Sequence, residues 1–70
     1  MTSEEVKQAM LDGSPVKYRD AEYKGIVAYI YRRVTDVHSG KVKFILQCEL
    51  LDRSGHSVVI VDAEKVNFIK

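Results

Sequence analysis

The first dozen residues have the hydrophobic spacing of a short helix. Apolar residues at i, i+3 and i+4 form one stripe, which consists of Val6, Ala9 and Met10. Thr2 stands before this segment and Glu5 follows three residues later, which is the spacing of a capping box. Gly13, with a proline two positions after it, favours a stop. The pattern predicts a helix over about residues 3–12 that needs a packing partner, because two or three turns are marginal alone.

The remaining chain has the β-branched, aromatic and alternating composition that is typical of strands. The segment 23–34 lacks helical spacing, and Gly25 near its start indicates a bulge or a sharp bend. In the segment 41–51 every even position from Val42 to Leu50 is apolar, which predicts one buried face. Asp62 then begins a single helical turn before a short last strand. The expected strands are PVKY, YKGIVAYIYRRV, KVKFILQCELL, SVVIV and NFIK.

The stretch DRSGH predicts a hairpin with a three-residue loop. Arg53 and Ser54 suit a type I turn, and Gly55 suits the left-handed position that follows it. The expected pairs are Asp52–His56, Leu50–Val58 and Cys48–Ile60. This register places apolar residues opposite apolar residues, so the loop and the hydrophobic pattern agree.

A longer hairpin precedes it, and we expect Arg33 to face Lys43 there. The same register sets Tyr31 opposite Ile45 and Tyr29 opposite Gln47. Two interpretations follow: cross-strand pairs that stabilise the outside of a barrel, or a contact surface. Aromatic and arginine side chains are frequent anchors of interfaces. The candidate partner-binding residues are Tyr29, Tyr31, Arg33, Lys43 and Ile45.

Length, charge and cysteine content limit the possible classes. Seventy residues make one domain, 1–70, which buries only about 60% of its unfolded surface. The net charge is +1, although residues 15–43 alone carry +4, from seven basic and three acidic side chains. A single cysteine forms no internal disulfide, and no apolar run approaches the ~20 residues of a membrane-spanning helix. We expect a cytoplasmic protein with no membrane association.

The reactive residue types do not form a recognisable catalytic or metal-binding pattern. His38 and His56 belong to different turns, and Cys48 lies on the expected core face without a base at suitable spacing. Most carboxylates fall in turns and caps. The sequence therefore predicts no metal, no cofactor and no enzymatic activity.

The order of elements, a helix followed by short, long, long, medium and short strands, resembles the SH3-like small β-barrel. This resemblance covers about residues 15–69 and implies a mainly β, five-stranded barrel with a helical turn before the last strand. The segments DGSPVKY and LLDRSGHSVVIV also resemble small barrel proteins of uncharacterised function that phages and mobile elements of Firmicutes carry. Sm-like RNA-binding proteins are similar in length and also begin with a helix. The chain has no tryptophan of the kind with which SH3 domains bind proline-rich peptides.

These observations predict a small, phage-related interaction module that binds a protein partner or forms a homo-oligomer through the long hairpin. The NFIK edge is a second possible surface for self-association. The alternative is a nucleic-acid-binding barrel, Sm-like or single-strand specific, that uses the same basic and aromatic face. A third class is a structural subunit held by backbone edge pairing. Salt separates the first two, because phosphate-driven binding weakens steeply with ionic strength.

Overall fold

The computed structural model describes residues 1–69, and over this range the chain is mainly β. The predicted N-terminal helix and the predicted helical turn before the last strand are both confirmed. The chain has six strands where the sequence predicts five. The elements are α1 (Ser3–Asp12), β1 (Val16–Tyr18), β2 (Ala21–Tyr23), β3 (Gly25–Thr35), β4 (Val42–Leu51), β5 (Val58–Asp62), η1 (Ala63–Lys65) and β6 (Val66–Phe68).

The sixth strand arises from a bend at Lys24, which divides the predicted long strand into β2 and β3. The backbone N–H of Lys24 donates to the carbonyl of Leu51 at 2.8 Å, so the bend stays attached to β4. The register then shifts between Ile26 and Ala28, which is a β-bulge. The irregularity expected near Gly25 is confirmed, and it lets one continuous stretch serve two sheets.

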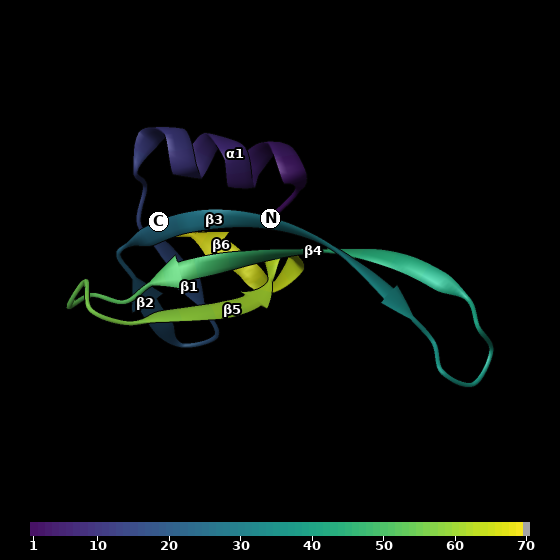
Figure 1. The fold of residues 1–70 in the computed structure, drawn as a ribbon. Helices are drawn as coiled ribbons and strands as arrows, with labels where there is room; N and C mark the ends of the chain where they lie inside the picture. The colour runs from purple at the N-terminus through teal and green to yellow at the C-terminus, as the bar shows by residue number, and fades with distance from the viewer. Residues whose placement is uncertain (70) are drawn as a thin grey trace.

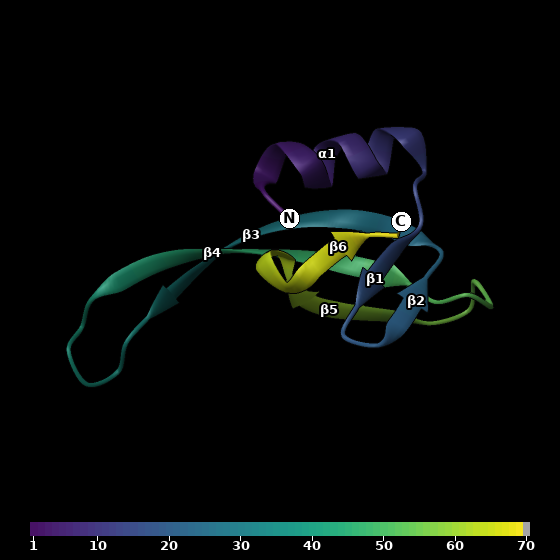
Figure 2. The same cartoon turned by 180° about the vertical axis from the view of Figure 1, so that it is seen from behind.

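The six strands form two antiparallel three-stranded sheets that face each other (Figure 1). One sheet has the order β2-β1-β6 and the other has the order β3-β4-β5. Within residues 1–69 no strand pairing joins β5 to the β2-β1-β6 sheet, so the expected closed five-stranded barrel is not formed. Viewed from behind, β1, β2 and β6 cover one side of the β3-β4-β5 sheet, while α1 lies along β3 (Figure 2).

The core between the sheets is small and is shared by every layer. Val6 and Ala9 of α1 are fully buried, as the apolar stripe predicts, and Met10 packs against them. Cys48 and Leu50 of β4 are also fully buried, which confirms the predicted apolar face of that half of β4. The other buried residues are Val16, Ile26, Val61, Ala63 and Val66.

Both ends of α1 have the predicted caps. The Thr2 hydroxyl accepts from the Glu5 N–H at 3.2 Å, and the Glu5 carboxylate accepts from the Thr2 N–H at 2.9 Å. Gly13 has φ +66°, the left-handed conformation that ends a helix. The N-terminal ammonium donates to the carbonyls of Ala63 and Val66, so the start of the chain is held against η1.

The β4–β5 loop contains four residues, one more than expected. Gly55 is left-handed (φ +77°), and its N–H donates to the Asp52 carbonyl at 3.0 Å, which confirms the turn over Arg53 and Ser54. However, Asp52 pairs with Ser57 and not with His56. The expected register is therefore wrong by one residue, and the observed pairs are Leu50–Val59 and Cys48–Val61.

The β3–β4 hairpin extends well beyond the two-sheet core. β5 pairs only with residues 47–51 of β4, so residues 31–46 form a two-stranded ribbon, which we call the arm. The arm gives the molecule extents of 40 × 23 × 18 Å and a radius of gyration of 13.1 Å. A compact domain of this length has a radius of gyration of about 11 Å. The molecule is therefore elongated, and the arm projects from one end (Figure 1).

The β1–β2 turn contains a strained residue whose replacement should stabilise the fold. Arg19 has φ +55°, a conformation that costs most L-residues about 1–2 kcal/mol and that asparagine tolerates better. Its guanidinium lies 5.3 Å from the Tyr18 ring centroid, a contact that contributes roughly 0.5–1 kcal/mol when exposed. We expect Arg19→Asn to raise the free energy of unfolding by about 0.5 kcal/mol, or Tm by a few degrees.

Thermal unfolding followed by circular dichroism measures this effect. Lys17→Asn is the control, since it removes the same charge from β1 at a position without positive φ. It should not raise Tm, because asparagine is disfavoured in strands. A lower Tm for Arg19→Asn would show that the contact with Tyr18 outweighs the backbone strain.

Candidate interaction surface

The loop at the tip of the arm sets the register of β3 against β4. The Asp36 N–H donates to the Lys41 carbonyl at 2.9 Å, which closes a loop of four residues. The Asp36 carboxylate accepts from the N–H of His38 at 2.8 Å, and Gly40 is left-handed with φ +72°. The expected pairing of Arg33 with Lys43 requires an odd number of loop residues. That register is wrong by one residue, and a shift of one moves every side chain of a strand to the other face.

The observed register divides the five candidate residues between two faces of the hairpin. Tyr29, Tyr31 and Arg33 lie on the face of Leu46 and Cys48, because their direct partners are Cys48, Leu46 and Phe44. Lys43 and Ile45 lie on the opposite face, with Val34 and Arg32 as their partners. The five do not form one surface. Whether any of them binds a partner stays a prediction.

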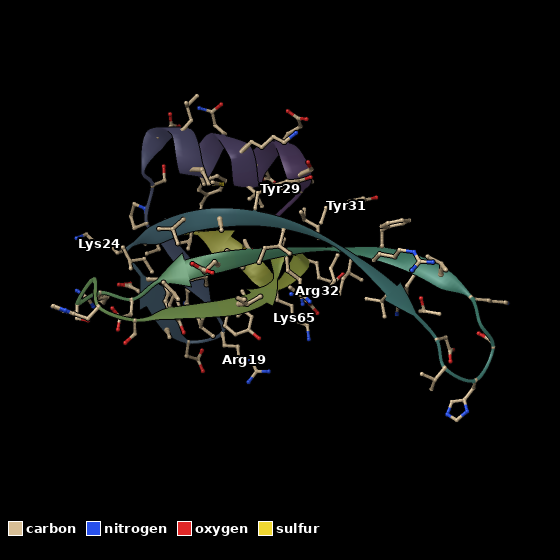
Figure 3. The ribbon with its side chains drawn as sticks, in the orientation of Figure 1. Arg19, Lys24, Tyr29, Tyr31, Arg32 and Lys65 are labelled. Atoms are coloured by element: carbon tan, nitrogen blue, oxygen red, sulfur yellow. The ribbon has the colours of Figure 1, made fainter. Side chains whose placement is uncertain are left out.

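Tyr29 is used within the fold. Its hydroxyl lies 3.0 Å from the Ser3 hydroxyl, and the Lys7 ammonium lies 5.4 Å from its ring centroid. The ring is half-buried against the core, beneath the start of α1 (Figure 3). Tyr29 therefore attaches the helix to β3, and its role in binding a partner stays a prediction.

Tyr31 is the most exposed aromatic residue of the hairpin, and it stacks on Phe44. The two rings are 5.2 Å apart between centroids and within 5° of parallel. Tyr31 is 65% exposed and Phe44 is 54% exposed, so the stacked pair covers only part of each ring. Val42, which is 44% exposed, extends the same side toward the tip. We call this side, made of Tyr31, Arg33, Val42, Phe44 and Leu46, the aromatic face.

Phe44 and Val42 were not among the predicted contact residues. The alternation along β4 correctly places them on the same side as Cys48 and Leu50, and that side predicts burial. They are exposed because β5 and the second sheet stop short of them. A prediction that gave the β3–β4 loop an even number of residues would have identified Phe44 and Val42, because an even loop places them on the same side as Tyr31.

The opposite side of the hairpin carries a chain of polar contacts across three strands. The Arg32 Nε donates to the Gln47 Oε1 at 2.8 Å, and the Gln47 Nε2 donates to the Asp62 Oδ1 at 3.0 Å. Figure 3 shows Tyr31 and Arg32 leaving β3 on opposite sides. Arg32, Gln47 and Asp62 are thus bonded to one another on this side, away from the stacked rings.

Opposite charges separate between the arm and the region at its base, although of the arm's cations only Arg33 lies on the aromatic face. The arm contains Arg32, Arg33, Lys41 and Lys43 against Asp36, a net charge of +3, and the rest of the chain sums to −2. Where the arm leaves the core, a shallow pocket of about 250 Å³ lies beside β4. Its lining consists of Met1, Phe44, Ile45, Leu46, Asp62 and Glu64. The arm is thus basic, and its base is acidic.

The carboxylates with shifted pKa values have structural partners. Backbone N–H groups of His38 and Ser39 lower the pKa of Asp36, and the Ser54 hydroxyl with three backbone N–H groups lowers that of Asp52. The Thr2 backbone N–H lowers the pKa of Glu5. Each shift belongs to a loop or a helix cap. In the described chain, 1–69, no three His, Cys, Asp or Glu residues are close enough to hold a metal ion.

Cys48 lies inside the core, and burial raises the pKa of its thiol. A raised pKa keeps the sulfur protonated at neutral pH and therefore a poor nucleophile. Its position on β4 opposite Val61 is that of a small hydrophobic residue.

Comparison with known proteins provides no relative from which a role could be transferred. No protein-family model, curated protein or solved structure matches the chain. None of the helices within residues 1–69 is long and apolar enough to cross a membrane. The resemblance to SH3-like barrels stays a prediction, and the arm is the feature on which a function can be argued.

The burial of Cys48 predicts slow modification of its thiol in the native state. We expect alkylation at least about 100-fold slower than that of an exposed cysteine, since reaction requires an opening of roughly 3 kcal/mol. Iodoacetamide labelling followed by mass spectrometry measures the rate. The control is a Cys48→Ala, Val37→Cys double variant, because Val37 is 90% exposed at the arm tip. Equal rates would show that the interior of the two sheets opens freely.

Proposed function

We propose that this protein is a non-enzymatic, cytoplasmic interaction module that binds a protein partner, or another copy of itself, through the aromatic face of its arm. The observation that carries the proposal is the stacked pair of Tyr31 and Phe44, exposed on a ribbon that projects from the core. Small domains do not need such a ribbon for their own core, and aromatic side chains are the most frequent anchors of protein interfaces.

Burial of Tyr31 and Phe44 alone does not provide enough free energy for association, so the interface must include neighbouring residues. An aromatic side chain buries roughly 150–250 Å², so the exposed portions of Tyr31 and Phe44 offer about 240 Å² in total. At about 25 cal/mol per Å² this burial contributes roughly 6 kcal/mol. Association costs about 4–15 kcal/mol in lost rigid-body freedom. The pair therefore anchors an interface, while Val42, Leu46 and Arg33 must supply the remainder.

The distribution of positive charge favours protein over nucleic acid. Arg33 lies on the aromatic face, whereas Arg32 and Lys43 lie on the opposite side of the ribbon. Arg32 is engaged with Gln47. The two rings stack on each other and are not spaced to receive successive bases. A nucleic acid lying on the aromatic rings would therefore meet few of the arm's cations.

Nucleic-acid binding remains the second candidate, because a two-stranded ribbon with a net charge of +3 has the size of a major-groove reader. We also propose that the chain is an open relative of the SH3-like small barrel, with a phage or prophage origin. The order of elements and the helical turn before β6 support the first of these. The origin depends on the sequence resemblance alone.

Site-specific photocross-linking tests the proposed function. We expect replacement of Phe44 by p-benzoylphenylalanine to give protein adducts on irradiation in cells, because this side chain lies at the centre of the aromatic face. The same replacement at Leu11, which is 82% exposed on α1, is the matched control and should give none. Adducts at neither position, or equally at both, would contradict the proposal.

Fluorescence anisotropy with labelled oligothymidine and with a DNA duplex separates the second candidate. We expect no binding of either at physiological salt. Tight binding that weakens steeply with salt and is lost in Tyr31→Ser would instead favour the nucleic-acid function.

A further inference from the structure

The edge of β4 that faces β5 is uncovered along the arm. β5 ends at Asp62, opposite Gln47, whereas β4 continues outward through residues 42–46 (Figure 1). Within residues 1–69, no other strand pairs with this part of β4 on that side. The uncovered edge is long enough for a short strand, and it lies directly in line with β5.

The backbone groups on this edge are ready for a further ladder. The Asp36 N–H donates to the Lys41 carbonyl, so β4 bonds to β3 through its odd-numbered residues near the tip. The N–H and C=O groups of Val42 and Phe44 therefore point to the open edge. Within the described chain, 1–69, no backbone group bonds to them there. An extended strand is the partner that offers donors and acceptors at the matching spacing.

The charges beside this edge define which strand fits. Successive side chains of an added strand alternate between the two faces, so such a strand meets charges on both. At the base, the pocket that includes Ile45, Asp62 and Glu64 suits a basic side chain, whose stem contacts apolar groups while its head meets carboxylates. One pair nearer the tip, Lys43 lies on the same face as Ile45 and favours a carboxylate. The aromatic face on the other side favours apolar side chains.

We propose that an extended segment of a different protein binds antiparallel to β4 along residues 42–46, as an added strand in line with β5. This inference rests on the proposed function and names its mode of binding. From its N-terminus the segment reads basic, apolar, acidic, apolar. These four residues lie opposite Ile45, Phe44, Lys43 and Val42 in that order. The antiparallel direction is that of β5, so the sheet keeps one pairing pattern along the whole of β4.

A second copy of the arm does not fit this edge. Two arms paired antiparallel about Phe44 would place Lys41 of each copy opposite Gln47 of the other. Asp62 already occupies that position. Pairing about Lys43 would place two ammonium groups opposite each other, which is destabilising. The occupant is therefore a segment of another protein.

Titration of the acetylated and amidated peptide SKVEVS into ¹⁵N-labelled protein, followed by NMR, tests the proposal. We expect a dissociation constant of about 0.1–1 mM, because a free peptide loses conformational freedom when it becomes a strand. The amide signals of Val42 and Phe44 should shift, and their hydrogen exchange should slow.

N-methylation of the peptide separates strand addition from side-chain contact. A methyl group on the first valine nitrogen, opposite Phe44, removes a donor that faces β4 and should weaken binding at least about tenfold. The same change on the glutamate nitrogen, opposite Lys43, is the matched control, because that N–H points away from β4. Equal effects of the two changes would overturn strand addition.

Reversed charges test the direction of the segment. Glu64→Lys should weaken binding of SKVEVS about threefold or more, and the peptide SEVEVS should restore it. Glu4→Lys, the same change at an exposed position of α1, is the control and should have no effect. Circular dichroism checks that both variants are folded. Tighter binding of the exchanged peptide SEVKVS to the wild type would overturn the antiparallel direction.

The remaining outcomes each overturn the proposal. Absence of any shift at about 2 mM peptide would exclude this mode of binding. Shifts confined to Val58 and Ile60 would assign the peptide to the outer edge of β5. A wild-type dimer in light scattering that Phe44→Ser dissociates would make a second copy the occupant. In each case the photocross-linking at position 44 decides the proposed function separately, since adducts there do not require an added strand.

Discussion

The pairing of β4 with strands on both sides is the constraint on which the rest of the structure depends. β4 is the central strand of its sheet, and its inner side provides Cys48 and Leu50 to the core. Its two neighbours are attached through loops of four residues each. Because the side-chain period of a strand is two, the even loop length determines which residues of β3 and β5 join Leu50 inside. A loop longer or shorter by one residue would turn Tyr29 and Val61 outward and remove the attachment site of α1.

The arm is a consequence of unequal strand lengths along that sheet. β4 has ten residues and β3 has eleven, whereas β5 has five and the strands of the second sheet have three each. The buried layer can extend only as far as the shorter strands reach. Beyond Gln47 the hairpin has no third strand and no facing sheet, so its inner side becomes a surface. An isolated two-stranded ribbon is marginally stable in water, and the stacking of Tyr31 on Phe44 is one of the contacts that hold it.

Local signals in the sequence predict much of the fold, and the global register is where they fail. The capping box of Thr2 and Glu5, the stop at Gly13 and the left-handed Gly55 each depend on neighbouring residues only, and all are confirmed. The register of β3 depends on the alternation of apolar and polar residues, and in β3 both alternating sets are apolar or aromatic. Tyr29 and Tyr31 occupy one set, and Ile30 occupies the other. The hydrophobic pattern therefore could not show which side of β3 faces the core. The composition of the β3–β4 loop did not decide the register either, because it is compatible with a loop of three or of four residues.

Closure of the barrel also could not be inferred from the sequence. The order of the strands along the chain does not show whether β5 pairs with the β2-β1-β6 sheet. The same limit applies to the candidate surface. Three of its five residues share a side with the core, and the residues that complete that side, Phe44 and Val42, carry the pattern of buried positions.

The apolar stripe at the even positions of β4 extends beyond the part of the strand that the fold covers. The apolar stripe of β4 runs without interruption from Val42 to Leu50, yet only its second half is covered within the chain: Leu50 is fully buried and Phe44 is 54% exposed. A ribbon that faced only water would be served equally well by threonine at position 42, which retains β propensity without an apolar surface. The continuation of the core stripe onto the projecting part of the hairpin is the feature on which the proposed contact surface rests.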